Sequence, residues 1–183
     1  MQHYFPMINT NFFIQGYAKV FSHDTRGGVF SSQADVANKN SDNPSAYLFS
    51  ILDQLERFRE TDGKFKFKLC YPELAWGVGG RTCNVWRQSS NPLTETTIKG
   101  FESISLAFTK DSYLRDWRGL GKSPSNLPYA AIDDAPTESA WWTAIGATRL
   151  HYGKIPGPRS DRDPNQIAIV TKVQLYVHVF LSL

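Results

Sequence analysis

The sequence predicts an α+β, β-rich domain made of antiparallel sheets or a sandwich, with one surface helix over about residues 44–60 and long loops. Three observations predict this class. Apolar and polar residues alternate in several segments, which is typical of half-buried strands. One segment instead has the spacing of an amphipathic helix. Long connections rich in Gly, Pro and polar residues separate these segments, as between Gly153 and Pro164.

The predicted helix begins at Asn43 and Pro44, a good N-cap followed by a residue suited to the first helical position. An apolar stripe at helical spacing follows. The stripe consists of Leu48, Ile51, Leu52, Leu55 and Phe58. Charged and amide side chains occupy the opposite positions, and Asp62-Gly63 ends the pattern. We expect one surface helix with a buried face.

Period-two rows predict three strands. In the first, residues 65–71, Phe and Leu alternate with lysines. The second contains Ile104, Leu106 and Phe108. The third keeps its apolar residues on one parity from Ile167 to Val179, interrupted only by Thr171. Because a late strand is usually paired, we expect the third to lie at the centre of the sheet or against the N-terminal strand.

Length and charge exclude several classes of protein. A chain of 183 residues suits one domain with a sizeable core, so we expect a single domain over residues 1–183, with 1–15 as an N-terminal extension or first strand. Its 20 basic and 17 acidic residues are spread along the chain, whereas nucleic-acid binders gather basic residues on one stripe. No apolar run reaches the length of a transmembrane helix. We therefore expect neither a nucleic-acid partner nor a membrane span.

Cys70 and Cys83 are the only cysteines in the sequence. On its alternating strand Cys70 shares the face of the lysines, where a free thiol would be open to oxidation. A disulfide between the two would close a glycine-rich loop, which stabilises a fold by about 3 kcal/mol. Since disulfides persist in oxidising compartments, this pairing predicts an extracellular, secreted protein. The alternative is a pair of reduced cysteines in a cytosolic protein.

Short segments spread over most of the chain from Gly16 onward carry a family resemblance. They are Gly16–Gly28, Phe49–Leu55, Phe67–Glu73, Cys83–Pro92, Trp117–Gly121, Ile132–Pro136, Trp141–Gly146 and Ile155–Pro158. Together they resemble a group of secreted invertebrate proteins that are distantly similar to fibrinogen-like and intelectin-like lectin domains. The segment Thr171–Tyr176 also resembles closing strands of discoidin-like sandwiches. The resemblance implies an extracellular lectin-like or adhesive module, with either a fibrinogen-like or a jelly-roll topology.

The densest acidic group is formed by Asp133, Asp134 and Glu138, beside Trp141 and Trp142. Calcium takes six to eight oxygen ligands, often from carboxylates on a loop. A calcium ion next to an indole ring suits sugar binding, because the ion takes hydroxyl groups while the ring stacks on the apolar face of the sugar. We therefore predict a calcium site at the three acids and a glycan-binding surface at the two tryptophans. The alternative is a solvated turn in which Asp134 or Thr137 caps a short helix around Glu138–Ala144.

A second candidate ligand site follows Cys83 directly. It comprises Trp86, Arg87, Gln88 and Asn91. Planar amides and a guanidinium beside an indole suit a hydroxyl-rich ligand. The alternative is that Trp86 belongs to the core and that the polar residues form a turn.

These patterns favour an extracellular recognition module that binds carbohydrate and catalyses nothing. Its expected partners are glycans or extracellular matrix components, and a structural matrix protein or filament, assembled from copies of the chain, is the second hypothesis. A glycoside hydrolase is the third, with Asp133 and Glu138 as the carboxylate pair to test. The sequence contains neither a Gly-x-Ser-x-Gly elbow nor a phosphate-binding glycine motif.

Overall fold

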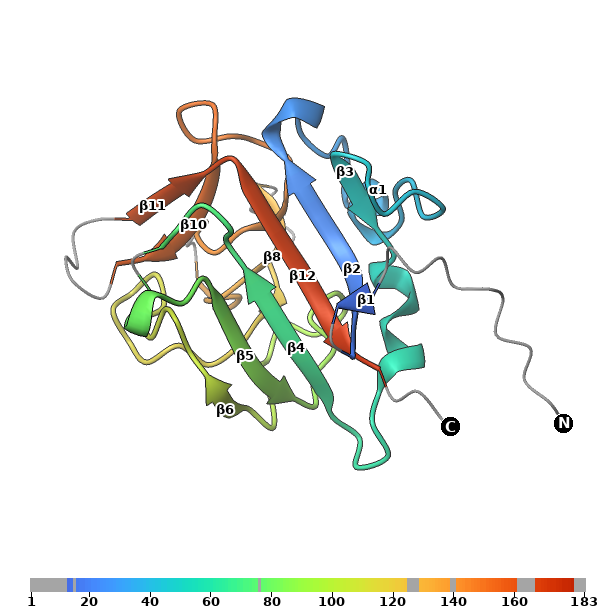
Figure 1. Cartoon of the computed structure of the whole chain (residues 1–183), viewed down its shortest axis with the longest axis vertical. Coiled ribbons are helices and arrows are strands. Elements are labelled where there is room, and N and C mark those ends of the chain that lie inside the picture. The colour runs from blue at the N-terminus through green and yellow to red at the C-terminus, as the bar shows by residue number, and fades with distance from the viewer. Residues whose placement is uncertain are drawn as a thin grey trace, which may run out of the picture.

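The alternating segments lie side by side in one antiparallel main sheet (Figure 1). Its strands are β1 (Phe13–Ile14), β2 (Tyr17–Asp24), β3 (Leu48–Ser50), β4 (Phe65–Cys70), β5 (Cys83–Gln88), β6 (Glu102–Ser105) and β12 (Lys172–His178). This computed structural model describes residues 13–14, 16–75, 77–124, 129–138, 141–160 and 167–179. The strand order in the main sheet is β1-β2-β12-β4-β5-β6, and β3 also pairs with β2. β12 therefore lies at the centre, between β2 and β4. This confirms the expected position of the last strand.

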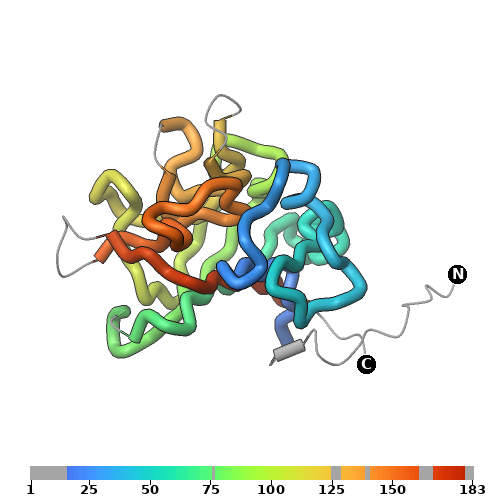
Figure 2. Tube along the Cα trace, turned by 90° about the horizontal axis from the view of Figure 1, so that it is seen from above, coloured from blue at the N-terminus to red at the C-terminus, as the bar shows by residue number. Residues whose placement is uncertain are grey.

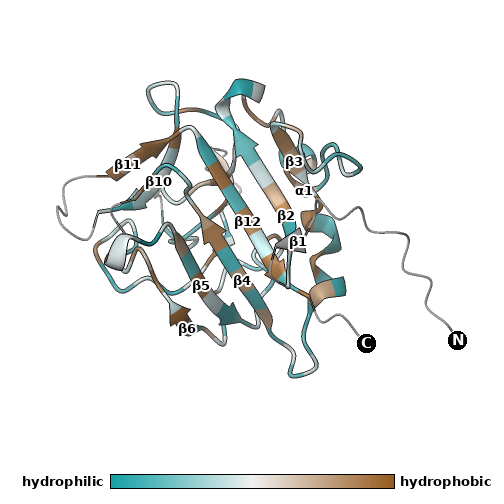
Figure 3. Ribbon diagram, in the orientation of Figure 1, coloured by the Kyte–Doolittle hydropathy of each residue, from teal (hydrophilic) through white to brown (hydrophobic). Residues whose placement is uncertain are grey.

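The two faces of the main sheet differ in character. Phe65, Phe67 and Leu69 of β4 are fully buried, whereas Lys66 and Lys68 between them are half-buried on the opposite face. Apolar and polar residues alternate in the same way along β12 (Figure 3). In β5 the inner positions instead hold Trp86 between the buried amides Asn84 and Gln88. The sheet thus has an inner, mostly apolar face and an outer, polar face, as period-two alternation favours.

A second layer covers the inner face of the main sheet. It consists of a three-stranded sheet, β7 (Gly121–Lys122), β8 (Ala130–Asp133) and β9 (Ile145–Ala147), and of the pair β10 (Ile155–Arg159) and β11 (Ile167–Val170). Seen from above, the yellow and orange segments of this layer lie on one side of the main sheet (Figure 2). Ile132, Ile145 and Ile155 of this layer belong to the same hydrophobic core as Phe67 and Leu175. The β-rich α+β class with antiparallel sheets is confirmed.

The helix predicted over residues 44–60 is wrong in its first half. Leu48–Ser50 forms β3, which pairs with β2, and only Leu52–Phe58 is helical, as the 3-10 segment η3. The exposed edge of β2 has backbone groups that need partners, and the apolar segment supplies them. Asn43 accepts a hydrogen bond from the Ser45 N–H within a turn, so it caps no helix. The apolar stripe is buried nonetheless, with Leu52 and Leu55 in the core.

The remaining helical segments are short. They are α1 (Gln33–Ala37) and the 3-10 segments η2 (Thr25–Gly27) and η4 (Val78–Gly80). α1 begins after Ser32, whose side chain accepts a hydrogen bond from the Asp35 N–H. Within the described ranges, no helix has both the length and the apolar character needed to span a membrane.

Two predicted strands are shorter than expected. The C-terminal row is divided at Thr171, whose N–H and hydroxyl both donate to the Glu73 carboxylate, so β11 and β12 belong to different sheets. The strand predicted from Ile104, Leu106 and Phe108 is observed as β6, which ends at Ser105. Beyond it, the side-chain oxygen of Asn84 accepts hydrogen bonds from the N–H groups of Ala107 and Phe108, in place of a backbone partner.

The Cys70–Cys83 disulfide is present. The two residues are directly opposite in the register of β4 and β5, so the bond joins the ends of two neighbouring strands. It lies on the outer face of the main sheet, as the parity of Cys70 predicted. The disulfide closes the connection from Tyr71 to Thr82. The N–H of Tyr71 also donates a hydrogen bond to the carbonyl of Thr82 at 2.9 Å.

Candidate functional site

Two adjacent buried carboxylates lie where β8 ends. Asp133 and Asp134 are 2% and 4% exposed. The carboxylate oxygens of Asp133 accept hydrogen bonds from the Ser123 hydroxyl at 2.9 Å and from the Ala135 N–H at 2.8 Å. This part of the predicted acidic site is therefore enclosed by the fold and does not face solvent.

Asp134 is held in the same way by hydroxyl groups. Its two oxygens accept hydrogen bonds from Ser112 at 2.9 Å and from Thr143 at 2.6 Å. The fully buried phenol of Tyr71 lies close enough for the Asp134 charge to raise its pKa, although burial is the larger cause. Asp134 thus connects the loop before β7, the end of β8 and the loop before β9.

Burial dominates the acidity of both carboxyl groups. It raises the pKa of Asp133 and that of Asp134 from the ordinary value of 3.8 to about 7, although the hydroxyl donors act in the opposite direction. The neighbouring charge contributes further: Asp134 raises the pKa of Asp133, and Asp111 raises that of Asp134. Burial therefore favours the protonated form of each group, relative to an aspartate in solvent.

The third acid of the predicted calcium site is engaged elsewhere. Glu138 forms an ion pair with Arg115, which also pairs with Asp111 at 2.8 Å. Among the described residues, no group of three or more His, Cys, Asp or Glu side chains is arranged to hold a metal ion. Calcium binding at Asp133, Asp134 and Glu138 stays a prediction of the sequence.

The two predicted tryptophans belong to an aromatic cluster. We define this aromatic cluster as Tyr129, Trp141, Trp142, His151 and Tyr152. The ring of His151 contacts three other rings of the cluster. Its centroid lies 5.8 Å from that of Trp141, 5.4 Å from that of Trp142 and 4.4 Å from that of Tyr152. Tyr129 packs against Trp141 at 5.0 Å. Both tryptophans are half-buried, so each ring packs on the protein and is partly exposed to solvent.

Tyr152 is the most exposed ring of the cluster, at 86%. It occupies the first central position of a two-residue turn in which His151 and Lys154 exchange both backbone hydrogen bonds, at 2.7 and 3.0 Å. Tyr152 and Gly153 have φ angles of +48° and +74°. A bulky residue in the left-handed region costs about 1–2 kcal/mol, and Asn is the usual choice at this position. The fold therefore holds a large aromatic ring in solvent at an energetic cost.

The backbone of the second layer positions this cluster. The backbone N–H of Thr148 donates a hydrogen bond to the carbonyl of Tyr129 at 2.9 Å. This bond extends the pairing of β8 with β9 as far as Tyr129, whose ring belongs to the cluster. On the other side, Thr143 and Ala144 donate to the carbonyls of Gly157 and Pro156 in β10 at 3.0 and 2.9 Å. The loops that carry the cluster are thus anchored at strands.

A positive charge and an indole N–H accompany the rings. The guanidinium of the exposed Arg149 lies 5.4 Å from the ring centroid of Tyr129 and 6.0 Å from that of Trp141, a cation–π arrangement. The Trp141 Nε1–H is buried without a hydrogen-bond partner within the described part of the chain. The cluster therefore combines apolar ring faces with several polar groups at their edges.

The second predicted ligand site is incorporated into the core. Trp86 and Gln88 are fully buried, because they share the inner parity of β5 with Asn84. The Gln88 oxygen accepts hydrogen bonds from Trp86 Nε1 at 2.7 Å and from the Leu120 N–H at 3.1 Å. Its amide nitrogen donates to the carbonyls of Ser90 and Leu120. Trp86 thus takes the core position that was the alternative, and neither side chain offers a face to a ligand.

Arg87 and Asn91 are likewise used by the fold. Arg87 lies on the outer face, where its guanidinium binds Glu60 and Asp62 at 2.5 Å and Glu102 at 3.3 Å. Asn91 is buried and donates to Glu56 at 2.8 Å. Of the two predicted ligand sites, only the one at Trp141 and Trp142 forms an accessible surface.

Sequence reasoning missed four residues of this region: Tyr129, Arg149, His151 and Tyr152. The signal that could have found the turn is His-Tyr-Gly-Lys at 151–154, a two-residue hairpin pattern with an aromatic residue in place of Asn. Comparisons with protein-family models, with curated proteins and with solved structures found no match.

Proposed function

We propose that this protein is an extracellular carbohydrate-recognition domain that binds its ligand on the aromatic cluster. One observation carries the proposal. Tyr152 is held 86% exposed, on a left-handed backbone, beside the half-buried ring of His151, which also packs on Trp142. An exposed aromatic ring maintained against a conformational preference is a feature of binding surfaces, because strain persists where function requires it.

The chemistry of the cluster suits a sugar. Aromatic rings pack on the apolar C–H faces of a pyranose, while polar groups at the ring edges fix its hydroxyl groups. Tyr152 and Trp142 supply aromatic rings, and the His151 imidazole packs against both of them. Arg149 supplies a guanidinium next to Tyr129 and Trp141.

The disulfide supports an extracellular location. Cys70 and Cys83 are joined in the folded chain, and such bonds persist in secreted proteins, whereas the cytosol keeps thiols reduced. Secretion also places the protein where glycans and matrix components are found.

A glycan array probed with the wild type and with Tyr152→Ala tests the proposal. We expect wild-type binding to a restricted set of glycans and a loss of about tenfold or more in Tyr152→Ala, since an interface ring contributes 1–3 kcal/mol. The matched control is Tyr113→Ala, which removes a 44% exposed ring outside the cluster and should leave binding unchanged. The absence of any glycan ligand, or equal binding by both variants, contradicts the proposal. Repeating the array with a chelator tests the predicted calcium requirement separately.

One observation favours a second candidate function, self-assembly into a matrix or filament. The strand β6 lies at the edge of the main sheet, and its residue Ile104 is 52% exposed. An exposed edge strand is a template for pairing with another chain. Scattering at increasing concentration tests this: ordered growth that Ile104→Lys abolishes supports assembly, and a constant monomer contradicts it.

A further inference from the structure

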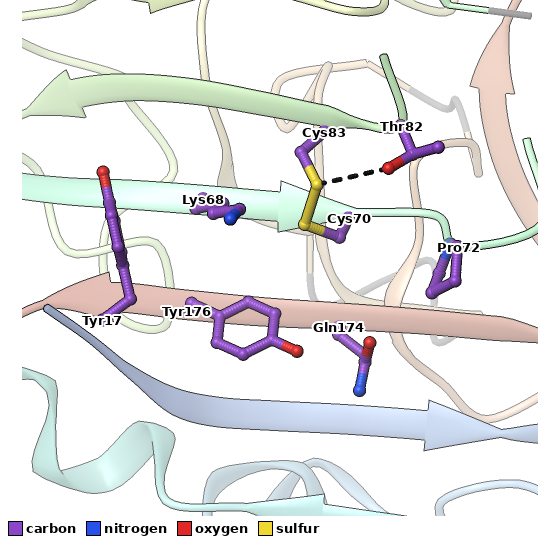
Figure 4. A pocket seen from close by; sticks show the side chains of 8 residues that line it. All are labelled: Tyr17, Lys68, Cys70, Pro72, Thr82, Cys83, Gln174 and Tyr176. Atoms are coloured by element: carbon purple, nitrogen blue, oxygen red, sulfur yellow. Dashed lines mark hydrogen bonds between the residues drawn. A yellow bond between two sulfur atoms is a disulfide. The ribbon is translucent and has the colours of Figure 1, made fainter. Parts of the chain in front are cut away.

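A pocket of about 200 Å³ opens on the outer face of the main sheet, beside the disulfide (Figure 4). Its lining includes Tyr17 of β2, Gln174 and Tyr176 of β12, Lys68 of β4 and the Cys70–Cys83 bond. It is separate from the aromatic cluster, whose residues belong to the loops of the second layer.

Two ammonium groups lie near the ring of Tyr17, which lines this pocket. The Nζ atoms of Lys66 and Lys68 lie 5.7 and 5.6 Å from the ring centroid of Tyr17. Both cations are attracted by the same ring, and Lys68 is itself part of the lining. Among the described residues, neither lysine forms an ion pair with a carboxylate.

The lysine and arginine at the far end of the same face are neutralised. Lys64 pairs with Glu102, and Arg87 pairs with Glu60, Asp62 and Glu102. Within β4, Lys64 is therefore paired with a carboxylate, whereas Lys66 and Lys68 form no such pair among the described residues. The charge of Glu60 also acts on Tyr17, but Glu60 is itself paired with Arg87. An anion at the two lysines does not have to displace a carboxylate that is paired with either of them.

The pocket also offers unused polar groups. In the described part of the chain, neither the Tyr176 hydroxyl nor the side-chain amide of Gln174 forms a hydrogen bond. The dashed line in Figure 4 marks the contact between Thr82 Oγ1 and Cys83 Sγ at 3.6 Å. The rings of Tyr17 and Tyr176 and the disulfide form apolar walls. This combination of apolar walls, two hydrogen-bonding groups and two cations suits a ring that carries hydroxyl groups and one negative charge.

We infer that this pocket is an anion-binding site that takes a sulfate or carboxylate group carried on a sugar ring. The choice of a sugar as carrier rests on the proposed function, whereas the anion site follows from Lys66, Lys68 and Tyr17 alone. The protein then binds a glycan at two places. The aromatic cluster contacts neutral sugar rings, and the pocket contacts a sugar that carries the acidic group.

Calorimetric titration with a sulfated heparin-derived tetrasaccharide tests the inference. We expect the wild type to bind it, with an affinity that falls steeply between low and physiological salt. The double variant Lys66→Gln/Lys68→Gln should lose about tenfold or more in affinity, as expected for removing two cations from the site. Lys64→Gln is the matched control: it lies on the same strand and face but its amine is paired, so its affinity should stay within about twofold.

Two further probes identify the ligand chemistry. The desulfated tetrasaccharide keeps only its carboxylates as anionic groups, so it should bind at this pocket more weakly than the sulfated one, and inorganic sulfate in excess should compete with both. Equal affinity in the double variant, or an equal loss in Lys64→Gln, overturns the inference. Tyr152→Ala should keep its affinity for the sulfated probe, so that failure of the aromatic-cluster proposal and failure of this one give different results.

Discussion

The Thr143 hydroxyl donates a 2.6 Å hydrogen bond to the buried carboxylate of Asp134, and Thr143 directly follows Trp142 in the chain. Thr143 has a φ angle of +52°, an unusual conformation for a β-branched residue. Its N–H also donates to the Gly157 carbonyl at 3.0 Å. The buried acid thus fixes the turn from which the aromatic cluster extends, and we assign Asp134 a positioning role.

Removing the Thr143 hydroxyl should weaken both the fold and the binding surface. Thr143→Val keeps the shape of the side chain but leaves one Asp134 oxygen without a donor, which costs about 1–3 kcal/mol. We expect this loss in the free energy of unfolding measured with urea, together with weaker glycan binding. Thr137→Val, at an exposed position of the preceding turn, is the control and should change stability by less than about 0.5 kcal/mol. Equal effects in the two variants contradict the positioning role.

The raised pKa values of Asp133 and Asp134 predict a pH-dependent stability. Because each group binds its proton more tightly in the folded chain than in the unfolded chain, its contribution to stability is fully present below about pH 4 and is lost as the pH rises to about 7. Asp134→Asn removes one such group. We therefore expect its Tm, measured from pH 4 to pH 8, to rise relative to that of the wild type as the pH increases. A Tm difference that is constant over this range contradicts the assignment.

Replacing Tyr152 by the residue that its backbone prefers should separate stability from function. Tyr152→Asn relieves the left-handed strain at φ +48° and should raise the free energy of unfolding by about 1 kcal/mol. The same variant should lose glycan affinity, because the exposed ring is gone. A gain in stability with unchanged binding would show that the ring is dispensable, and would contradict the role we propose for it.

The disulfide predicts a specific redox behaviour. Native protein should show no alkylation of Cys70 or Cys83 by iodoacetamide until a reductant is added, as mass spectrometry can measure. Cys70→Ala/Cys83→Ala should unfold about 3 kcal/mol more easily, because the sequence separation of 13 residues between the joined cysteines limits the unfolded chain. Alkylation of both residues in untreated native material would remove the argument for secretion.

Much of the sheet could be predicted from residue alternation. The parity of β4 placed Phe67 in the core and Cys70 outside it, and both are found there. The same rule, applied from Cys83 along β5, would also have placed Trp86 and Gln88 inside. The prediction was misled by the chemistry of these side chains. In a sequence, a buried Gln that satisfies all its hydrogen bonds cannot be told apart from a ligand-binding Gln at the surface.

Other features depend on contacts that one sequence does not reveal. Residues 48–50 have helical spacing, yet the free edge of β2 recruits them as β3, so a tertiary contact overrides the local pattern. The aromatic cluster unites Tyr129 with Trp141 and His151, and only the pairing of β8 with β9 and the turn before β10 brings them together. Spacing along the chain indicated the two tryptophans alone.

The most direct test of the central claim, that a glycan binds on the aromatic cluster, is a nuclear magnetic resonance titration that follows the indole N–H signals. With the best glycan from the array as ligand, we predict that the signals of Trp141 and Trp142 shift in a saturable manner, while those of the buried Trp86 and Trp117 stay in place. Shifts confined to other residues, with both cluster tryptophans unmoved at saturation, would contradict the account.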